Sequence, residues 1–157
     1  MDPLQVVPNT EKHASRLRSV GLRATTPRLA ILAELENDKR HPSAEMLLET
    51  LVDDYPSLSL STVYATLEAF LHKGLIRRIS GLSGKLRVDG NVYDHDHAVC
   101  RCCGDVFDVP HQPHRPDVPR ELPQGLRVMK LHIEYEVICE MCAQVPENSS
   151  ENGRRAH

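Results

Sequence analysis

Four cysteines form two pairs with the spacing of a metal clamp. Cys100 and Cys103 are separated by two residues, as are Cys139 and Cys142, and 35 residues lie between the pairs. Two such C-x-x-C pairs are typical of a structural zinc ion held tetrahedrally by four thiolates. Cys102 also lies in the first cluster, so the partner of Cys100 stays open, although only Cys103 gives the two-residue spacer. The alternative is a set of unrelated buried or redox-active thiols.

A second group of potential ligands precedes the first cysteine pair. His95 and His97 alternate, so on a β-strand both side chains project to one face and can hold the same ion. Imidazole and carboxylate donors suit iron, manganese or a second zinc. Spacing does not decide which neighbouring carboxylate completes the site, and the candidates are Asp89, Asp94, Asp96 and Asp108. The isolated histidines are expected to be solvent-exposed or satisfied inside the core, namely His13, His72 and His157.

Length and composition favour one large domain or two small ones. The chain has 157 residues and a formal net charge of −3, with no apolar run that could cross a membrane and no N-terminal signal peptide. We therefore expect a cytoplasmic protein whose cysteines bind metal rather than form disulfides. The first 80 residues carry ten basic and ten acidic side chains, and the rest carry nine and twelve. The acidic second half suits cation capture, whereas any DNA contact falls to the first half.

Helix signals dominate the first half of the chain. Thr10, Thr26, Ser43 and Ser59 are each expected to cap the start of a helix, with Pro27 at the first helical position of the second one. Apolar residues at three- and four-residue spacing extend the predicted helices over residues 10–20, 26–37, 43–51 and 59–73. Two strand-like runs follow at 75–80 and 85–88, on either side of a glycine-rich turn.

Helices followed by a two-stranded hairpin form the pattern of a winged helix-turn-helix, in which the helix before the hairpin enters the DNA major groove. The exposed face of that helix is small and hydroxylic, with Ser61 opposite the apolar stripe and Thr62 and Tyr64 on its two flanks. Basic residues of the hairpin are expected to contact phosphates, namely Arg77, Arg78, Lys85 and Arg87. The alternative is a solvated helical bundle with a hairpin and no DNA contact.

The second half of the chain changes to β-rich alternation. One strand region is expected around Val99, Val106 and Val109, and another over residues 126–138. Between them, the proline-rich stretch 110–123 leaves room for at most a short helix at 118–122. The fold class is therefore α+β. The predicted organisation is a flexible arm (1–9), a winged-helix DNA-binding domain (10–88), a metal-binding domain (89–145) and a disordered tail (146–157).

Several motifs together resemble the ferric uptake regulator (Fur) family, in the family's order, from about Leu17 to Cys142. They are Thr26-Pro27-Arg28, His41-Pro42-Ser43-Ala44-Glu45, Ser61-Thr62-Val63-Tyr64-Ala65-Thr66-Leu67, Gly74-Leu75-Ile76, Asp94-His95-Asp96-His97-Ala98-Val99-Cys100, Cys103-Gly104 and Cys139–Cys142. The resemblance implies a homodimeric, metal-dependent repressor of transcription that binds double-stranded operator DNA and is not an enzyme. It also implies an N-terminal winged helix and a small C-terminal α/β dimerisation domain with a four-cysteine zinc site.

In this family the sensing metal is held between the two domains. The matching positions here are His41, Asp89, His95, His97 and Asp108. Aspartate at the last position, where iron-sensing members usually carry glutamate, favours the peroxide-sensing (PerR-type) subgroup. For that subgroup the resemblance implies that bound Fe(2+) reacts with hydrogen peroxide, with oxidation of His41 or His95. Mn(2+) would then permit repression without sensitivity to peroxide.

The DNA-binding surface also has candidate residues, and the chain departs from the family's pattern in two places. Ser61, Thr62 and Tyr64 are the candidate base contacts, with Arg28 on phosphate. The proline-rich stretch replaces a helix of the dimer domain, so the dimer interface is expected to be reduced. Leu131 stands where the family often has a third-site histidine, and the neighbouring His132 would face the other side of a strand. His111 and His114 are further histidines without support as ligands.

Two alternatives of different kinds remain. The first is a sensor of iron or zinc supply with the same fold and no histidine oxidation. The second is a zinc-dependent hydrolase that uses His95 and His97, which would need an open coordination position, a nucleophilic water and a general base in a pocket. The sequence shows no signature of that base or that pocket.

Overall fold

The computed structural model describes residues 9–38, 40–79, 86–110, 123–128, 131 and 133–144. The chain forms two compact units, residues 1–94 and 95–157. The division falls after Asp94, later along the chain than the boundary predicted after Val88. Several predicted features lie outside the described residues: the N-terminal arm before Asn9, the hairpin tip with Lys85, the short helix at 118–122, His111, His114, His132 and the C-terminal tail. Within the described residues, no helix is long and apolar enough to cross a membrane.

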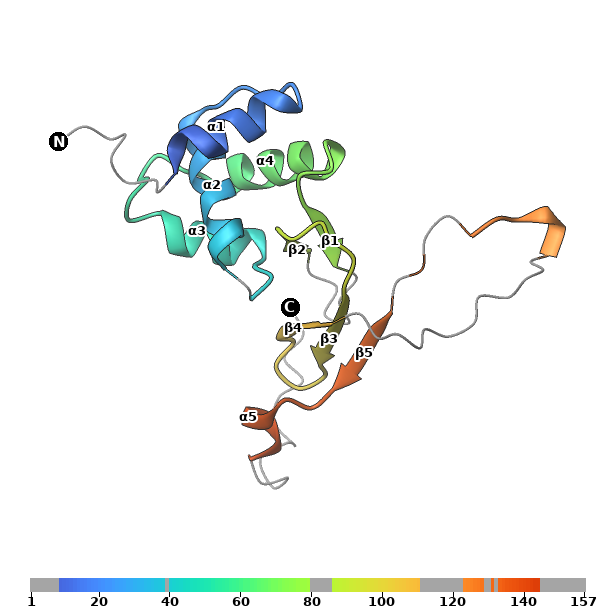
Figure 1. Cartoon of the computed structure of the whole chain (residues 1–157). Coiled ribbons are helices and arrows are strands. Elements are labelled where there is room, and N and C mark those ends of the chain that lie inside the picture. Colours follow the sequence, from blue (N-terminus) through green and yellow to red (C-terminus); the bar gives the residue numbers. More distant parts are fainter. Residues whose placement is uncertain are drawn as a thin grey trace. The chain divides into compact units, whose positions relative to one another are not determined.

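The described part of the first unit consists of four helices and a two-stranded antiparallel sheet (Figure 1). The helices are α1 (Thr10–Ser19), α2 (Thr26–Asn37), α3 (Ala44–Leu51) and α4 (Leu60–His72). The sheet joins β1 (Arg77–Ile79) to β2 (Arg87–Asp89) directly after α4. This order, three helices before a helix and its hairpin, is that of a winged helix-turn-helix, as the sequence predicted.

The helix starts agree with the sequence where a side chain caps the first turn. Ser43 Oγ accepts a hydrogen bond from the Met46 backbone N–H at 3.3 Å, and Ser59 Oγ accepts one from Thr62 at the same distance. The predictions for the first two helices were wrong by one residue. Asn9 and Thr25 are the N-cap residues there, and neither side chain makes a capping hydrogen bond.

The core of the first unit lies where α2, α3 and α4 meet. Val63, Leu67 and Phe70 of α4 are fully buried, which confirms the centre of the predicted apolar stripe. Leu60 and Leu71 at its edges are only partly buried and pack against the same cluster. Burial of such side chains stabilises the fold by about 1.5–3 kcal/mol each. The stripe therefore fixes which face of α4 remains for a partner.

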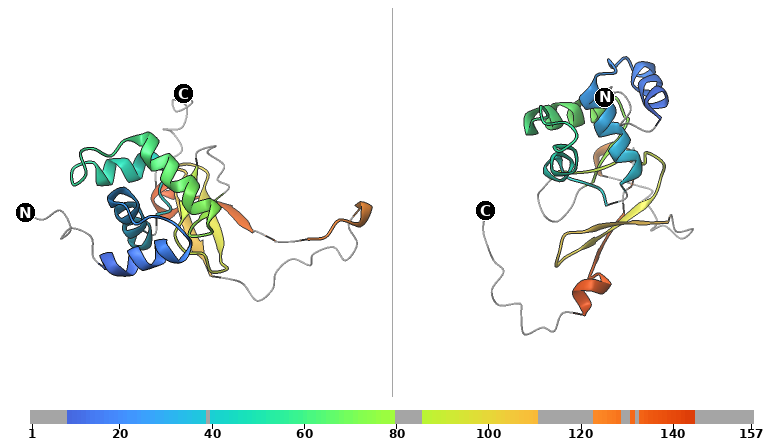
Figure 2. Two further views of the ribbon diagram at one scale, coloured as in Figure 1. Left: turned by 90° about the horizontal axis from the view of Figure 1, so that it is seen from above. Right: turned by 90° about the vertical axis from the view of Figure 1, so that its left-hand side faces the viewer.

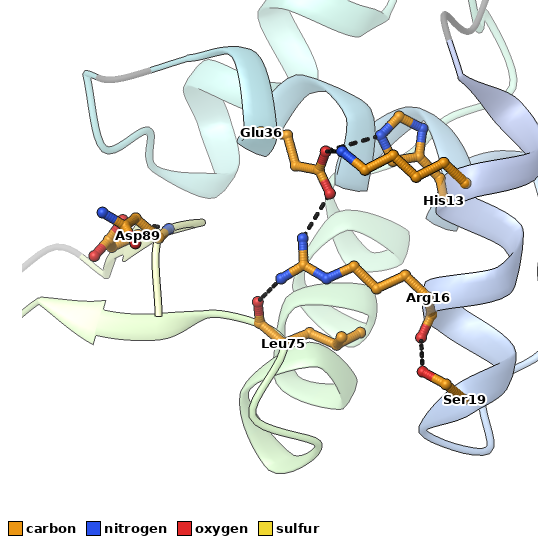
Figure 3. A network of polar contacts seen from close by, with 8 residues as sticks. His13, Arg16, Ser19, Glu36, Leu75 and Asp89 are labelled. Atoms are coloured by element: carbon orange, nitrogen blue, oxygen red, sulfur yellow. Dashed lines mark hydrogen bonds and ion pairs between the residues drawn. The ribbon is translucent and has the colours of Figure 1, made fainter. Parts of the chain in front are cut away.

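A hub of three basic side chains around Glu36 attaches α1 to the end of α2 (Figure 3). Glu36 Oε1 accepts a hydrogen bond from Arg16 at 2.6 Å, while Oε2 contacts Lys12 Nζ at 2.9 Å and His13 Nε2 at 3.2 Å. Arg16 also donates to the Leu75 carbonyl at 3.1 Å, between α4 and β1. The hub thus ties the first helix to the base of the hairpin. His13 is buried, in agreement with a histidine satisfied inside the core.

The Glu36 hub predicts a loss of stability in acid. Burial by itself raises the pKa of Glu36. Hydrogen bonds from Lys12, Arg16 and His13 lower it by more, so the net pKa falls from the ordinary value to about 2. Because the folded pKa lies below the ordinary value of 4.5, the contribution is complete above pH 4.5 and is lost as pH falls toward 2. Glu36→Gln should lower the free energy of unfolding by about 1 kcal/mol at pH 7, since solvent screens part of the hub.

Urea unfolding at pH 7 and pH 3 measures this difference between the Glu36→Gln variant and the unchanged protein. The difference should shrink at pH 3, where Glu36 of the unfolded chain already binds a proton. Glu49→Gln, at an exposed position of α3, is the matched control and should change stability at neither pH. A Glu36→Gln effect of equal size at both pH values would contradict the assignment of the low pKa to folding.

The second unit is built on a three-stranded sheet with the order β4-β3-β5. The strand β3 (Asp96–Cys100) pairs antiparallel with β4 (Val106–Val109) and parallel with β5 (Glu134–Val137). The short helices η2 (Pro123–Gly125) and α5 (Glu140–Ala143) complete the described part, and Figure 2 gives two further views. The region predicted around Val99 and Val109 is therefore two strands, joined by the turn that carries the first cysteine pair.

Candidate metal centres and nucleic-acid interface

Four cysteine sulfurs of the second unit form one compact cluster. The Sγ atoms of Cys100, Cys103, Cys139 and Cys142 all lie within 4.8 Å of one another, and those of Cys103 and Cys139 are 3.8 Å apart. A tetrahedral zinc ion with Zn–S bonds of about 2.3 Å separates its sulfurs by about 3.8 Å. The four side chains therefore fit a closed structural zinc site. Exposed Cys102 is not a member of the cluster.

The backbone explains why these sulfurs meet. Cys100 ends β3, and the turn after it brings the Gly104 N–H to the Cys100 carbonyl at 2.8 Å. Gly104 adopts a φ of 76°, a left-handed conformation that glycine reaches without strain. The second knuckle starts at Cys139, whose backbone N–H donates to the Cys100 sulfur at 3.4 Å before α5 carries Cys142. The two predicted cysteine pairs thus follow different strands of the sheet.

The surroundings of the sulfur cluster shift the pKa values of three of its thiols. Backbone N–H groups of Cys103 and then Cys139 donate to Cys100 and lower the pKa of its thiol to about 6. The Asp105 backbone lowers the pKa of Cys103, but burial and the Cys100 sulfur raise it more, to about 11. The neighbouring sulfur of Cys139 raises the pKa of Cys142. Zinc binding must displace the protons of the Cys103 and Cys142 thiols, so its affinity rises with pH.

Two histidines and one aspartate meet on the sheet of the second unit. His95 Nε2 lies 3.0 Å from Asp108 Oδ1, and His97 Nε2 lies 3.8 Å from the same oxygen. The His95 and His97 ring centroids are 4.5 Å apart, as expected for side chains on one face. His97 lies opposite Asp108 in the β3–β4 register, which brings their side chains to the same face. Neighbouring donors of a metal with bonds of about 2.1 Å lie about 3 Å apart, so this group suits an ion.

The other carboxylates that spacing allowed are placed differently. Asp96 points to the opposite face of β3, because it is adjacent to His97 on the strand, and it is 1% exposed. Asp94 belongs to the first unit and lies 3.6 Å from Arg77.

A histidine–aspartate pair lies in the first unit. His41 Nε2 is 3.9 Å from Asp89 Oδ1, and both side chains are almost fully buried. The pair meets because the Val88 N–H donates to the Pro42 carbonyl at 3.2 Å, which draws the loop after α2 to β2. His41 has a φ of 55°, an uncommon conformation for a residue with a side chain. Strain of this kind gathers at functional sites.

Glycine follows Asp89 for a steric reason. A Cβ atom at Gly90 would lie 2.4 Å from the Leu35 carbonyl oxygen, so only hydrogen fits between this turn and α2.

Asp89 was predicted to belong to the second domain, but it ends β2 of the first unit. The candidate regulatory ligands therefore divide into His41 and Asp89 on one unit and three side chains on the other. Sequence reasoning also missed Arg77 as a partner of Asp89.

The predicted DNA-reading residues lie at the start of α4. Ser59 Oγ contacts Ser61 Oγ at 2.9 Å and Thr62 Oγ1 at 2.8 Å, so the first turn presents a group of hydroxyls. Tyr64 Oη donates to Glu45 Oε1 at 2.7 Å, which raises the pKa of Tyr64. Arg28 on α2 donates to the Arg23 carbonyl at 3.2 Å.

Two of the hairpin arginines that were predicted to contact phosphates make internal contacts. Arg87 is buried, and its Nη1 contacts Met46 Sδ at 2.7 Å. Arg77 is 14% exposed and contacts Asp89 and Asp94. Arg78, between Arg77 and the end of β1, is exposed, so its contact with a DNA phosphate stays a prediction.

Known proteins resemble this chain across both units. The profile of the ferric uptake regulator family matches residues 19–135. The peroxide operon regulator of Bacillus subtilis (strain 168) is 32% identical over 130 residues, which cover 82% of this chain and 89% of that protein. The Vibrio cholerae ferric uptake regulator has a TM-score of 0.62 at 29% identity, covering 80% of this chain and 98% of that chain. The Campylobacter jejuni peroxide stress regulator has a TM-score of 0.58 at 28% identity, covering 90% and 100%.

Proposed function

Because the chain belongs to the ferric uptake regulator family, we propose that it is a metal-dependent repressor that binds operator DNA as a homodimer and senses hydrogen peroxide. The observation that carries this proposal is the grouping of His95, His97 and Asp108 around a common point on the second unit. A nitrogen and oxygen donor set of this kind suits Fe(2+) or Mn(2+), whereas the four sulfurs suit Zn(2+). The chain would thus hold two metals with separate tasks, and we propose no enzymatic activity.

The regulatory ion is proposed to take ligands from both units. His41 and Asp89 would supply a nitrogen and an oxygen from the first unit, and His95, His97 and Asp108 the remaining three donors from the second. Five ligands drawn from two units bind metal better when the units are held in one arrangement. By linkage, the arrangement that binds metal best is then populated more when metal is present. A shift from mostly open to mostly closed needs about 5.5 kcal/mol of differential affinity.

DNA binding is assigned to α4 and its neighbours. The hydroxyls of Ser61 and Thr62 and the phenol of Tyr64 would reach base edges in the major groove, with Arg28 on a phosphate. A twofold dimer would present two such helices to two half-sites. The sheet of the second unit supports dimerisation, because Phe107 and Tyr135 flank Ala98 in register on one face and both remain exposed.

Peroxide sensing is the finer part of the proposal. Its support is Asp108 at the last ligand position and the similarity to peroxide regulators at 32% and 28% identity. His41 or His95 would hold Fe(2+) next to the carbon that is oxidised, and the bound ion would mediate the reaction with peroxide by one-electron chemistry that Mn(2+) does not readily supply, with no net change in the oxidation state of the ion. One peroxide oxygen would be added to an imidazole carbon of His41 or His95, and the other would leave as water. A modified imidazole binds the metal ion poorly. The two units would then no longer share the ion, and DNA would be released.

The decisive experiment compares DNA binding with Mn(2+) and with Fe(2+), before and after peroxide. A duplex selected from a random library in the presence of Mn(2+) serves as the probe, and fluorescence anisotropy gives the affinity. We expect tight binding with either metal, loss of at least tenfold after peroxide only in the Fe(2+) form, and an added oxygen on His41 or His95 by mass spectrometry. Binding that ignores both metals would reject the proposed repressor. Metal-dependent binding without added oxygen would favour the second candidate, a sensor of iron or zinc supply.

A further inference from the structure

Arg77 contacts the segment that carries a candidate ligand of the regulatory metal. It lies opposite Asp89 in the β1–β2 register, with Arg77 Nη2 at 3.6 Å from Asp89 Oδ2. The same guanidinium reaches Asp94 Oδ1 at 3.6 Å and donates to the Tyr93 carbonyl at 2.5 Å. All these residues belong to the first unit, so the contacts do not depend on the second. Arg77 therefore binds both ends of the turn that follows β2.

The two oxygens of Asp89 face different partners. Oδ1 accepts a hydrogen bond from the Asn91 N–H at 2.7 Å and lies 3.9 Å from His41 Nε2, whereas Oδ2 faces Arg77. Asp89 is only 3% exposed, and a buried carboxylate is costly unless a positive charge or a hydrogen bond compensates it. Arg77 supplies that positive charge.

We propose that Arg77 is an internal counter-ion of Asp89 that competes with the regulatory metal and so raises the metal concentration needed for repression. The inference rests on the proposed function, because it takes Asp89 to be a ligand of that metal. Arg77 already neutralises the Asp89 carboxylate. A divalent ion that binds Asp89 therefore adds excess positive charge and repels the guanidinium beside it. Binding must therefore displace Arg77 or hold two positive centres close together, and either effect lowers the metal affinity.

The competing explanation is that Arg77 only supports the fold of the turn. Two nested hydrogen bonds already order that turn without Arg77: Asn91 N–H to Asp89, and Tyr93 N–H to Asn91 Oδ1 at 3.1 Å. The two explanations predict opposite signs. Loss of a supporting residue would misplace Asp89 and weaken metal binding, whereas loss of a competing charge would strengthen it.

The test is a Mn(2+) titration of the zinc-loaded, full-length protein, followed by the electron paramagnetic resonance signal of free Mn(2+). Arg77→Gln should bind Mn(2+) about tenfold more tightly than the unchanged protein. Arg77→Lys keeps the charge and should stay within about twofold. Arg78→Gln removes the same charge at the next, exposed position of β1 and should not change the Mn(2+) affinity. If Arg77→Gln does not fold, Arg77→Met, which keeps an apolar stem, takes its place.

An unchanged or weaker Mn(2+) affinity in Arg77→Gln would overturn the counter-ion. An equal gain in Arg78→Gln would also overturn it, because the effect would then come from net charge alone. Asp89→Ala, titrated in parallel, separates this failure from that of the proposed function. If Asp89→Ala binds Mn(2+) as the unchanged protein does, Asp89 is no ligand and both proposals fall. If Asp89→Ala loses binding while Arg77→Gln is unchanged, only the role of Arg77 is rejected.

Discussion

Replacing His41 with alanine is expected to abolish metal-dependent DNA binding while leaving the zinc content unchanged. His41 is the imidazole of the first unit that lies beside Asp89, and it would connect the winged-helix unit to the metal ion. Without it the ion keeps Asp89 as its only proposed ligand from the first unit, beside the three from the second, and so loses most of its preference for the closed arrangement. The affinity for the selected duplex in saturating Mn(2+) should fall at least a hundredfold, toward the metal-free value. Anisotropy titrations with and without Mn(2+) give both numbers.

The backbone at His41 requires a second variant. Alanine is strained at a φ of 55°, whereas asparagine tolerates this conformation and also lacks the imidazole. His41→Asn should therefore behave as His41→Ala does if the imidazole matters, and differ from it if only the backbone matters. His72→Ala, at the exposed end of α4, is the matched control for Mn(2+) affinity. Full metal dependence with unchanged Mn(2+) affinity in both His41 variants would refute the proposed ligand set.

Those parts of the fold that depend on local chemistry could be predicted from the sequence. Ser43 and Ser59 start their helices as predicted because their hydroxyls accept hydrogen bonds from the backbone three residues later. Asn9 and Thr25 are residue types favoured at N-caps, but neither side chain makes a capping hydrogen bond, and a threonine follows each of them, so residue type alone does not choose between the two adjacent positions. A threonine one position later was then mistaken for each cap.

The candidate sites divide in the same way. The spacing of Cys100 and Cys103 and the alternation of His95 and His97 are local, and the structure groups them as expected. The closeness of His41 to Asp89 depends on a hydrogen bond between Pro42 and Val88, far apart in the sequence. No pattern of residue types encodes that contact.

The arginines of the hairpin show the same limit. The hairpin register sets Arg77 opposite Asp89, which turns a candidate phosphate contact into an internal ion pair. From composition alone, Arg77 and Arg78 were equivalent. Their separation into an internal and an exposed charge is a consequence of strand pairing, because neighbouring residues of a strand point to opposite faces.

Replacing Cys103 with serine is expected to remove zinc and unfold the second unit, whereas the same change at Cys102 should do neither. Among the described residues of this unit, few apolar side chains are buried, namely Ala98, Val99, Cys100 and Val106. A core of that size does not hold a domain of this length without a metal or another staple. Zinc bound by four thiolates contributes about 10–16 kcal/mol at pH 7 in comparable small sites, which is more than such a core can replace.

Zinc content by atomic absorption and thermal unfolding by circular dichroism measure the two outcomes. Cys103→Ser should lose its one zinc per chain, and a transition of the second unit should no longer be observed. Cys102→Ser is the control, because Cys102 is exposed and its sulfur is outside the cluster, so one zinc per chain and an unchanged transition are expected. The first unit has its own core and its own Glu36 hub, so its unfolding transition should persist in both variants. Zinc retained by Cys103→Ser and lost by Cys102→Ser would reverse the assignment of the first knuckle.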